Sequence, residues 1–428
     1  MAADITLDDF TTEARAFLDA NAEKRPAHNA DDEFVWGQGD DGVAVLEDVD
    51  RDAEANALAR AKQWRATRFD NGFGWIQGPL ELGGRGLSAA YERAYGQLEA
   101  QYVTPDTSFF GIGLGMVAPT IVAHAQPHIV ERYVAKMYRG DIVGAQLFSE
   151  PGAGSDLAGL QMRAIRDGEE WVVTGQKVWT SGAHYSDIGE IICRTDPDVP
   201  KHKGLTGFVV DLGSPGIEIR PLRQMTGGAS FNEVFFNEVR VPDDHRLGDV
   251  NGGWTVALTT LMNERASIGG GGIGGGGGIA SGTRLMAMLS EFGKVDDPVL
   301  RNRFAEVYIG FQVAKYTNLR ASAKLKAGGL PGPEMSIGKL ALTANLWNVA
   351  QFAAEVLGPR ICANTGEWGT YSWNGMLLGV PGLRIAGGTD EVMRNIIGER
   401  VLGLPKEPDI SKNQPFRDVL VGTQRSEG

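Results

Sequence analysis

Cysteine is scarce in this chain of 428 residues, and histidine is uncommon. The two cysteines, Cys193 and Cys362, have no CxxC spacing, so the sequence predicts neither a disulfide framework nor a thiolate metal site. The six histidines include no HExxH-type pair, and His124 and His128 have no acidic partner at ligand spacing. These absences predict that the protein holds no metal ion.

Positive charge is also in deficit, because 41 lysines and arginines stand against 54 aspartates and glutamates, for a net charge of −13. Such a surface argues against nucleic acid as a partner. No window reaches the roughly 18 consecutive apolar residues that a membrane span requires. The first ten residues lack the basic and apolar regions of a signal peptide, and we therefore expect a cytoplasmic protein.

The pattern of apolar residues changes twice along the chain. The first third has helical periodicity, and short runs rich in Val, Ile, Phe and Trp begin near Val143. Helical periodicity returns after Pro242, with long helices expected at 299–327 and 336–357. One core usually stops growing at about 250–300 residues, so a chain of this length should form two or three domains. The predicted domains are 1–142 (helical), 143–248 (β) and 249–428 (helical).

The first helix has a recognisable start. Thr6 is the predicted N-cap, and two aspartates follow in the first turn, where negative charge favours the helix dipole. Its apolar residues fall on one face and should pack in a helical domain: Phe10, Ala14, Phe17 and Leu18.

The most informative segment runs from Gln146 to Ser181 and contains a Glu-Pro-Gly-Ala-Gly-Ser-Asp run followed by a Trp-Thr-Ser run. Gly152 and Gly154 allow the backbone to turn tightly beside a ligand. Hydroxyl groups and a flat ring complete a surface suited to a flavin. These groups belong to Ser149, Ser155 and Trp179.

The order of these motifs resembles the acyl-CoA dehydrogenase family, whose middle domain carries the same Glu-Pro-Gly-x-Gly-Ser-Asp and Trp-x-Ser signatures. Similar segments occur at 72–86 and 239–242, so the resemblance covers most of the chain. It implies an α+β fold with an N-terminal helical domain, a middle antiparallel β domain and a C-terminal four-helix bundle. It also implies FAD as cofactor, an acyl-CoA substrate, and electron-transferring flavoprotein as the electron acceptor.

The resemblance also locates the catalytic base. Many members place a Glu directly before a Gly-Thr near the C-terminus, where this chain has Gly387. The isovaleryl and long-chain branches instead use a Glu on the helix after the β domain, directly before an Arg, and Glu264 and Arg265 match that pair. The resemblance therefore implies that Glu264 removes the α proton while hydride passes to flavin N5. The backbone N–H of Gly387 remains available to polarise the substrate carbonyl.

Further contacts are implied by the resemblance, position by position. Arg265 matches an Arg near the CoA portion, and Ser155 lies near the flavin phosphates and the pantetheine entrance. Taken singly, Trp179 is equally well explained as a core residue and Thr389 as a helix cap. The positions matched to flavin contacts are Gln146, Phe148, Ser149, Gly154, Ser155, Trp179, Thr180, Ser181, Glu355, Thr389 and Glu391.

Two departures concern the adenine end of the cofactor site. Leu289 stands where the family often has an Arg that reaches the FAD of a neighbouring subunit. Glu355 replaces a Gln that approaches a neighbouring adenine. The assembly is expected to be a homodimer or homotetramer, with a mixed assembly as the alternative.

Nine glycines occupy 269–278, where a helix should continue. Each glycine costs a helix interior about 1 kcal/mol relative to Ala. One interpretation is a plain loop. The other is that missing side chains make room for a bulky or branched acyl group, because the same helix borders the acyl pocket in the family.

Two other functions fit the same cofactor motifs. One is a catalytically silent subunit of a mixed dehydrogenase assembly, against which Glu264 argues. The other is an oxidase or monooxygenase that reacts with oxygen on the same scaffold. Nicotinamide binding by the glycine-rich segment is excluded, because no strand precedes it and no ribose-binding acid follows.

Overall fold

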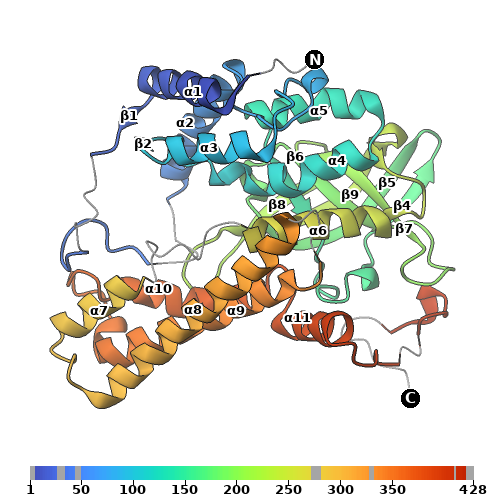
Figure 1. Cartoon of the computed structure of the whole chain (residues 1–428). Coiled ribbons are helices and arrows are strands. Elements are labelled where there is room, and N and C mark those ends of the chain that lie inside the picture. The colour runs from blue at the N-terminus through green and yellow to red at the C-terminus, as the bar shows by residue number, and fades with distance from the viewer. Residues whose placement is uncertain are drawn as a thin grey trace.

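A computed structural model of the chain describes residues 5–26, 34–43, 50–270, 281–326, 332–408 and 411–420. Within these ranges the side chains at 265–270, 322, 324–326 and 335 are not described. Figure 1 shows N-terminal helices above a twisted sheet, with the C-terminal helices running from the sheet towards the lower left.

The N-terminal part is helical, as predicted. The N-cap prediction is confirmed, because Thr6 accepts a hydrogen bond from the backbone N–H of Asp9, and the predicted apolar face of the first helix is buried. The elements here are α1 (Leu7–Asn21), β1 (Glu23–Lys24), α2 (Arg51–Asp70), α3 (Ala89–Glu99), β2 (Tyr102–Val103), α4 (Ala118–His124) and α5 (Pro127–Arg139).

The central sheet has the strand order β10-β7-β6-β4-β5-β9-β8, and β3 pairs with β6. Most neighbours are antiparallel, but β3 runs parallel to β6, so a purely antiparallel sheet is not what forms. The strands are β3 (Gly144–Leu147), β4 (Arg163–Asp167), β5 (Glu170–Ser181), β6 (Ile188–Arg194), β7 (Leu205–Asp211), β8 (Ile217–Leu222), β9 (Phe231–Pro242) and β10 (Arg246–Leu247).

Alternating side chains give the sheet two different faces, because successive residues of a strand point to opposite sides. On β6, Ile191 and Cys193 pack on one face of the sheet, in a core formed with side chains of the other strands. Ile188 and Ile192 point the other way and pack with residues of α4, α5 and α6 (Gly253–Gly270). The helix α6 therefore lies on the sheet face that also meets the N-terminal helices.

The C-terminal part is built around α9 (Met335–Leu357), which packs against α6, α7, α8, α10 and α11. The predicted helices at 299–327 and 336–357 are confirmed. The remaining bounds are α7 (Gly282–Glu291), α8 (Pro298–Lys326), α10 (Ser372–Leu383) and α11 (Asp390–Ile396). Residues 271–280, which hold most of the glycine-rich segment, lie outside the described residues.

The predicted fold class is confirmed: a helical N-terminal part, a largely antiparallel sheet and a C-terminal helical bundle. The domain boundaries at 142/143 and 248/249 remain predictions.

Candidate active site

A buried ion pair fixes the loop after β3 to strand β5. The Lys177 ammonium donates to the Glu150 carboxylate (2.9 Å) and to the carbonyls of Phe148 (3.0 Å) and Ile192 (2.9 Å). Glu150 also accepts the backbone N–H groups of residues 161 and 162. Lys177 is fully buried, and removing one partner of such a pair typically costs about 3–5 kcal/mol. The loop that carries the Glu-Pro-Gly motif is therefore fixed to strands β5 and β6 by buried contacts.

The tip of this loop is open to solvent. Gly152, Gly154 and Ser155 are exposed, and no atom lies within 4 Å of the place where a Cβ would stand on either glycine. Neither glycine has a positive φ, so the turn itself does not require glycine. What the two glycines provide is free space above the loop, next to the Ser155 hydroxyl.

Trp179 has an unusual environment for a strand residue. Its backbone φ is +61° and lies in a register shift between β5 and β9, while its side chain is 56% exposed. The ring meets only the edge of Phe231 among the described aromatic contacts. A tryptophan whose backbone is in the left-handed region costs about 1–3 kcal/mol of folding stability. Such a conformation usually persists only where the surrounding structure enforces it. The structure therefore contradicts the interpretation of Trp179 as a core residue.

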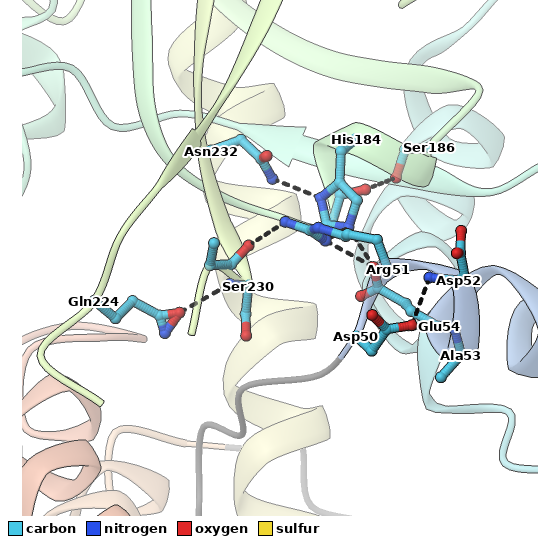
Figure 2. A network of polar contacts seen from close by, with 12 residues as sticks. Asp50, Arg51, Asp52, Ala53, Glu54, His184, Ser186, Gln224, Ser230 and Asn232 are labelled. Atoms are coloured by element: carbon cyan, nitrogen blue, oxygen red, sulfur yellow. Dashed lines mark hydrogen bonds and ion pairs between the residues drawn. The ribbon is translucent and has the colours of Figure 1, made fainter. Parts of the chain in front are cut away.

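A chain of hydrogen bonds holds the backbone next to Trp179. The Asn232 amide donates to the Thr180 carbonyl (3.1 Å) and to Nδ1 of His184 (3.0 Å). The His184 Nε2–H donates to Glu54 on α2 (2.9 Å). Figure 2 shows His184 at the centre of this network. The contacts tie the Trp179 segment to the first turn of a helix about 130 residues earlier in sequence.

Arg51 completes the same network. Its guanidinium contacts His184 and pairs with Glu54 (2.7 Å), as can be followed in Figure 2. It also donates to the carbonyl of Ala229 (2.7 Å). The three charged or polar side chains of Arg51, Glu54 and His184 thus brace the turn that follows Ser181.

Buried polar atoms without a partner remain beside this segment. The hydroxyl of Thr180 and the amide oxygen of Asn232 are both buried and make no hydrogen bond within the described part of the chain. Such atoms are uncommon and need an explanation, for example a bound group. Gln146, Ser149 and Ser181 lie half buried in the same region, and Phe148 is buried.

The proposed base lies on a different element. Glu264 is on α6, half buried, one helical turn after the fully buried Thr260. The helix α6 packs against β6 and β7 on one side and against α9 on the other, so it stands between the sheet and the bundle. Arg265 is on the same helix, but its side chain is not among those described.

The Gly-Gly-Thr turn begins α11. Gly387 and Gly388 have φ values of +66° and +91°, so glycine suits both positions. Thr389 caps the helix by accepting the N–H of Val392 (3.1 Å), which supports its interpretation as a cap. Asp390 is buried, and hydrogen bonds to Arg384 and Thr343 hold its pKa below the usual value although burial opposes ionisation.

Two predicted cofactor residues lie on the surface of the bundle. Glu355 on α9 pairs with Arg303 (3.2 Å), and Glu391 on α11 pairs with Arg394 (3.5 Å). The structure thus brings the residues of β3, β5 and the following loops together on the sheet. It places Glu355, Gly387, Thr389 and Glu391 on the bundle, where α9 packs against both α6 and α11.

Other parts of the molecule offer less. A cavity of about 540 Å³ opens between α5 and the ends of β6 and β7, and it is lined by Arg132, Lys136, His184, Asp187 and others rather than by the predicted site residues. In the described ranges, no cluster of three metal-binding side chains occurs. The described helices include none with both the length and the apolar character to cross a membrane.

The sequence interpretation missed the residues that support the site. Glu150 begins the Glu-Pro-Gly motif and Lys177 lies two residues before Trp179, and a lysine at an inward position of a strand is a usable signal. His184 and Asn232 gave no such signal, because their partners are distant in sequence.

Comparisons with known proteins find matches over most of the chain. Residues 145–239 match the middle-domain model of the acyl-CoA dehydrogenases, and residues 251–402 match the C-terminal-domain model. The acyl-CoA dehydrogenase IpdE1 of Mycobacterium tuberculosis is 36% identical over 359 residues, which are 83% of this chain and 90% of that protein. FadE34 of the same organism is 40% identical over 291 residues, or 68% of this chain but only 39% of that longer protein.

The likeness extends to solved structures. A chain of the ChsE4–ChsE5 complex from Mycobacterium tuberculosis superposes with a TM-score of 0.67 at 24% identity, covering 95% of this chain and 100% of that one. At this identity the comparison supports the fold alone. Together with the domain matches and the identity to IpdE1, it leads to the conclusion that the chain belongs to the acyl-CoA dehydrogenase family, whose members are FAD-dependent oxidoreductases.

Proposed function

We propose that this acyl-CoA dehydrogenase forms a trans-2-enoyl-CoA with Glu264 as the base that removes the α proton. The observation that carries the proposal is the position of Glu264, half buried on the helix between the sheet and the bundle, while Gly387 has no side chain to do the same work. A carboxylate that loses water when substrate covers it becomes a stronger base.

The residues on the sheet fit a bound FAD. The exposed ring of Trp179, the unpartnered buried hydroxyl of Thr180 and the open space at Gly154 are each suited to contact a bound group. When bound, the flavin supplies the hydride acceptor that side chains lack. We assign to the cofactor surface Gln146, Phe148, Ser149, Gly154, Ser155, Trp179, Thr180 and Ser181, and on the bundle Glu355, Thr389 and Glu391.

The thioester itself requires two further contributions. The backbone N–H of Gly387 is proposed to donate to the substrate carbonyl, where enolate-like charge develops as the α proton leaves. Ser155 and Arg265 are proposed to hold the CoA portion. The left-handed backbone at Gly387 and Gly388 leads into the capped start of α11, which gives this donor a defined direction.

The test is Glu264→Gln, which keeps the shape of the side chain and removes its basicity. We expect retained FAD and retained acyl-CoA affinity, with kcat lowered by at least about 100-fold. Glu306→Gln, at a glutamate on α8 paired with Arg303, is the matched control and should leave kcat unchanged. Undiminished turnover of Glu264→Gln would remove the assignment.

Electron-transferring flavoprotein is the proposed acceptor. A silent subunit of a mixed assembly, or an oxidase or monooxygenase, is the alternative. Anaerobic addition of acyl-CoA should bleach the flavin of a dehydrogenase, whereas no bleaching with any thioester favours an alternative. Rapid reoxidation of the bleached flavin by oxygen alone favours an oxidase.

The acyl group is proposed to be bulky or branched, because glycines dominate 269–278 after the helix that carries Glu264. Rates with straight-chain and ring-bearing acyl-CoAs test this. A clear preference for short straight chains would contradict it.

We also propose that the protein is a homo-oligomer, assembled through α8. One face of this helix packs on α9 through residues such as Leu300 and Val307. The opposite face exposes more than half of each of three large apolar side chains, Ile309, Val313 and Tyr316. Contiguous exposed apolar surface of this kind is typical of an interface, and a second copy of the chain presents the same surface.

A further inference from the structure

Glu190 is a fully buried glutamate that the proposed mechanism does not use. It lies on β6, on the face that packs against α4 and α6. Its Oε1 is 2.6 Å from the hydroxyl of Thr260 on α6, and that hydroxyl is 2.9 Å from the hydroxyl of Thr120 on α4. Its Oε2 is buried without a hydrogen-bond partner in the described structure. A buried acid at the junction of a strand and two helices therefore has one oxygen bonded and one unpaired.

Counting hydrogens shows which form of Glu190 suits this junction. The hydroxyl of Thr120 also lies 2.9 Å from the carbonyl of Met116, and each threonine has a single hydroxyl hydrogen. If Glu190 is protonated, its O–H donates to Thr260, Thr260 donates to Thr120, and Thr120 donates to the Met116 carbonyl. If Glu190 is ionised, Thr260 must donate to it, and Thr120 can serve only one of its two acceptors. The Thr260 hydroxyl also lies 3.3 Å from the carbonyl of Val256. The neutral acid therefore supplies a hydrogen to three of these four contacts, whereas the ionised acid leaves hydrogens for only two.

Thr260 connects this series of hydrogen bonds to the proposed base, Glu264. Residues four apart on a helix lie on one face, one turn from each other, so the face of α6 that contacts Glu190 through Thr260 continues to Glu264. A second contact, between His124 and Thr259 (2.8 Å), joins α4 to the same turn of α6. Across the sheet, Glu190 is in register with Gln146, one of the proposed flavin contacts.

We propose that Glu190, as an uncharged carboxylic acid, is a positioning residue that sets where α6 presents Glu264. This rests on the proposed role of Glu264. Glu190 is fully buried and is not among the residues proposed to contact substrate or cofactor. Its ionisation places a charge where water cannot reach, which α6 can relieve only by moving away from the sheet. Catalysis is therefore expected to fail when Glu190 loses its proton.

The surroundings support a proton that is held through neutral pH. Residues that face Glu190 from β3, β7, α4 and α6 are Gln146, Val209, Thr120 and Thr260, and none is charged. The titratable groups on the neighbouring turns are His124 and Glu264. Burial raises the pKa of Glu190 to about 8, and the Thr260 hydrogen bond only partly opposes this. Because the pKa is raised, the neutral form is present below about pH 8 and is lost as pH rises through that value.

The experiment compares kcat across pH 6 to 9.5 for the FAD-loaded wild type, Glu190→Gln, Glu190→Ala and Cys193→Ala, with an artificial electron acceptor. Gln is neutral at every pH and keeps the size of the side chain. Cys193 is the matched control, because it is buried on the same strand but points to the opposite face. FAD content and KM are measured for each variant.

We expect kcat of the wild type to fall above about pH 8, and Glu190→Gln to retain its neutral-pH kcat there. Glu190→Ala should lose about 10- to 100-fold in kcat with FAD content and KM unchanged, as small misplacements of a catalytic group can do. Cys193→Ala should follow the wild type. The same alkaline fall in Glu190→Gln, or full kcat in Glu190→Ala, would overturn the proposal. If Glu190→Ala does not fold, the pH profile of Glu190→Gln decides alone. Failure of the base assignment is separate, because it appears as turnover in Glu264→Gln.

Discussion

Trp179 combines a left-handed backbone with a ring that is more than half exposed to solvent. Either feature alone is uncommon for a tryptophan in a sheet, and each opposes stability rather than supporting it. The Asn232 amide donates to the carbonyl of the neighbouring Thr180, and its bond to His184 holds the amide in place, so the adjacent backbone is fixed. This is the pattern expected where a side chain is kept ready for a ligand.

Trp179→Gly should therefore separate binding from folding. Glycine accepts the positive φ, so we expect unfolding of the FAD-free protein to change by no more than about 1 kcal/mol. FAD binding should weaken at least about tenfold, as expected for loss of a stacking surface worth about 1.4 kcal/mol. Chemical denaturation and FAD titration measure the two effects.

The control for this prediction is Trp171→Gly, at a tryptophan buried on the same strand. Loss of a buried aromatic side chain costs about 3–5 kcal/mol. A comparable loss of stability in Trp179→Gly, with unchanged FAD affinity, would show that Trp179 is structural.

At the scale of single residues, sequence motifs indicated the proposed flavin contacts but not the residues that hold them in place. Ser149 and Trp179 were proposed because they stand in or directly beside short motifs. Glu190 was not found, because its meaning depends on Thr260, which is 70 residues away in sequence. A local sequence pattern cannot indicate a contact between residues so far apart in the chain.

At the scale of elements, α8 shows how one helix can serve two surfaces. Its inner face packs in the hydrophobic core together with α9. Its outer face carries three solvent-exposed apolar side chains, Ile309, Val313 and Tyr316. An apolar stripe on both faces is typical of a helix buried in an assembly.

Charges on the outer face should break the proposed assembly. We expect Val313→Asp combined with Tyr316→Asp to produce a monomer, measured by light scattering during size-exclusion chromatography, with helical content retained. Ile165→Asp, at an exposed apolar residue on β4, should leave the oligomer intact. A wild type that is monomeric alone and assembles only with a related chain would indicate a mixed assembly instead.

Elements with strong local signals were predictable. The helix α1 has a cap and one apolar face, and it begins where predicted. The helices α8 and α9 have long periodic patterns and lie close to their expected bounds. The parallel pairing of β3 with β6 was not predicted, because the direction of pairing depends on where the chain crosses between strands. Thr389 was found as a possible cap and does cap α11.

At the scale of the molecule, the proposed function requires residues from two separate parts of the chain, the sheet and the bundle. The sheet carries the proposed flavin contacts, and the bundle carries the Gly-Gly-Thr turn. The helix α6 packs against both, and the buried chain from Glu190 to Thr120 attaches it to the sheet and to α4. Glu264 lies on this helix, which packs against the sheet, α4 and α9.

The most direct test of this account is anaerobic mixing of the FAD-loaded protein with a panel of straight-chain, branched and ring-bearing acyl-CoA thioesters, with the visible absorbance of the flavin followed in time. The wild type should bleach with at least one thioester. Glu264→Gln, with the same FAD content and bound to the same thioester, should not bleach on that timescale. Bleaching of Glu264→Gln at the wild-type rate would contradict the central claim that Glu264 is the base.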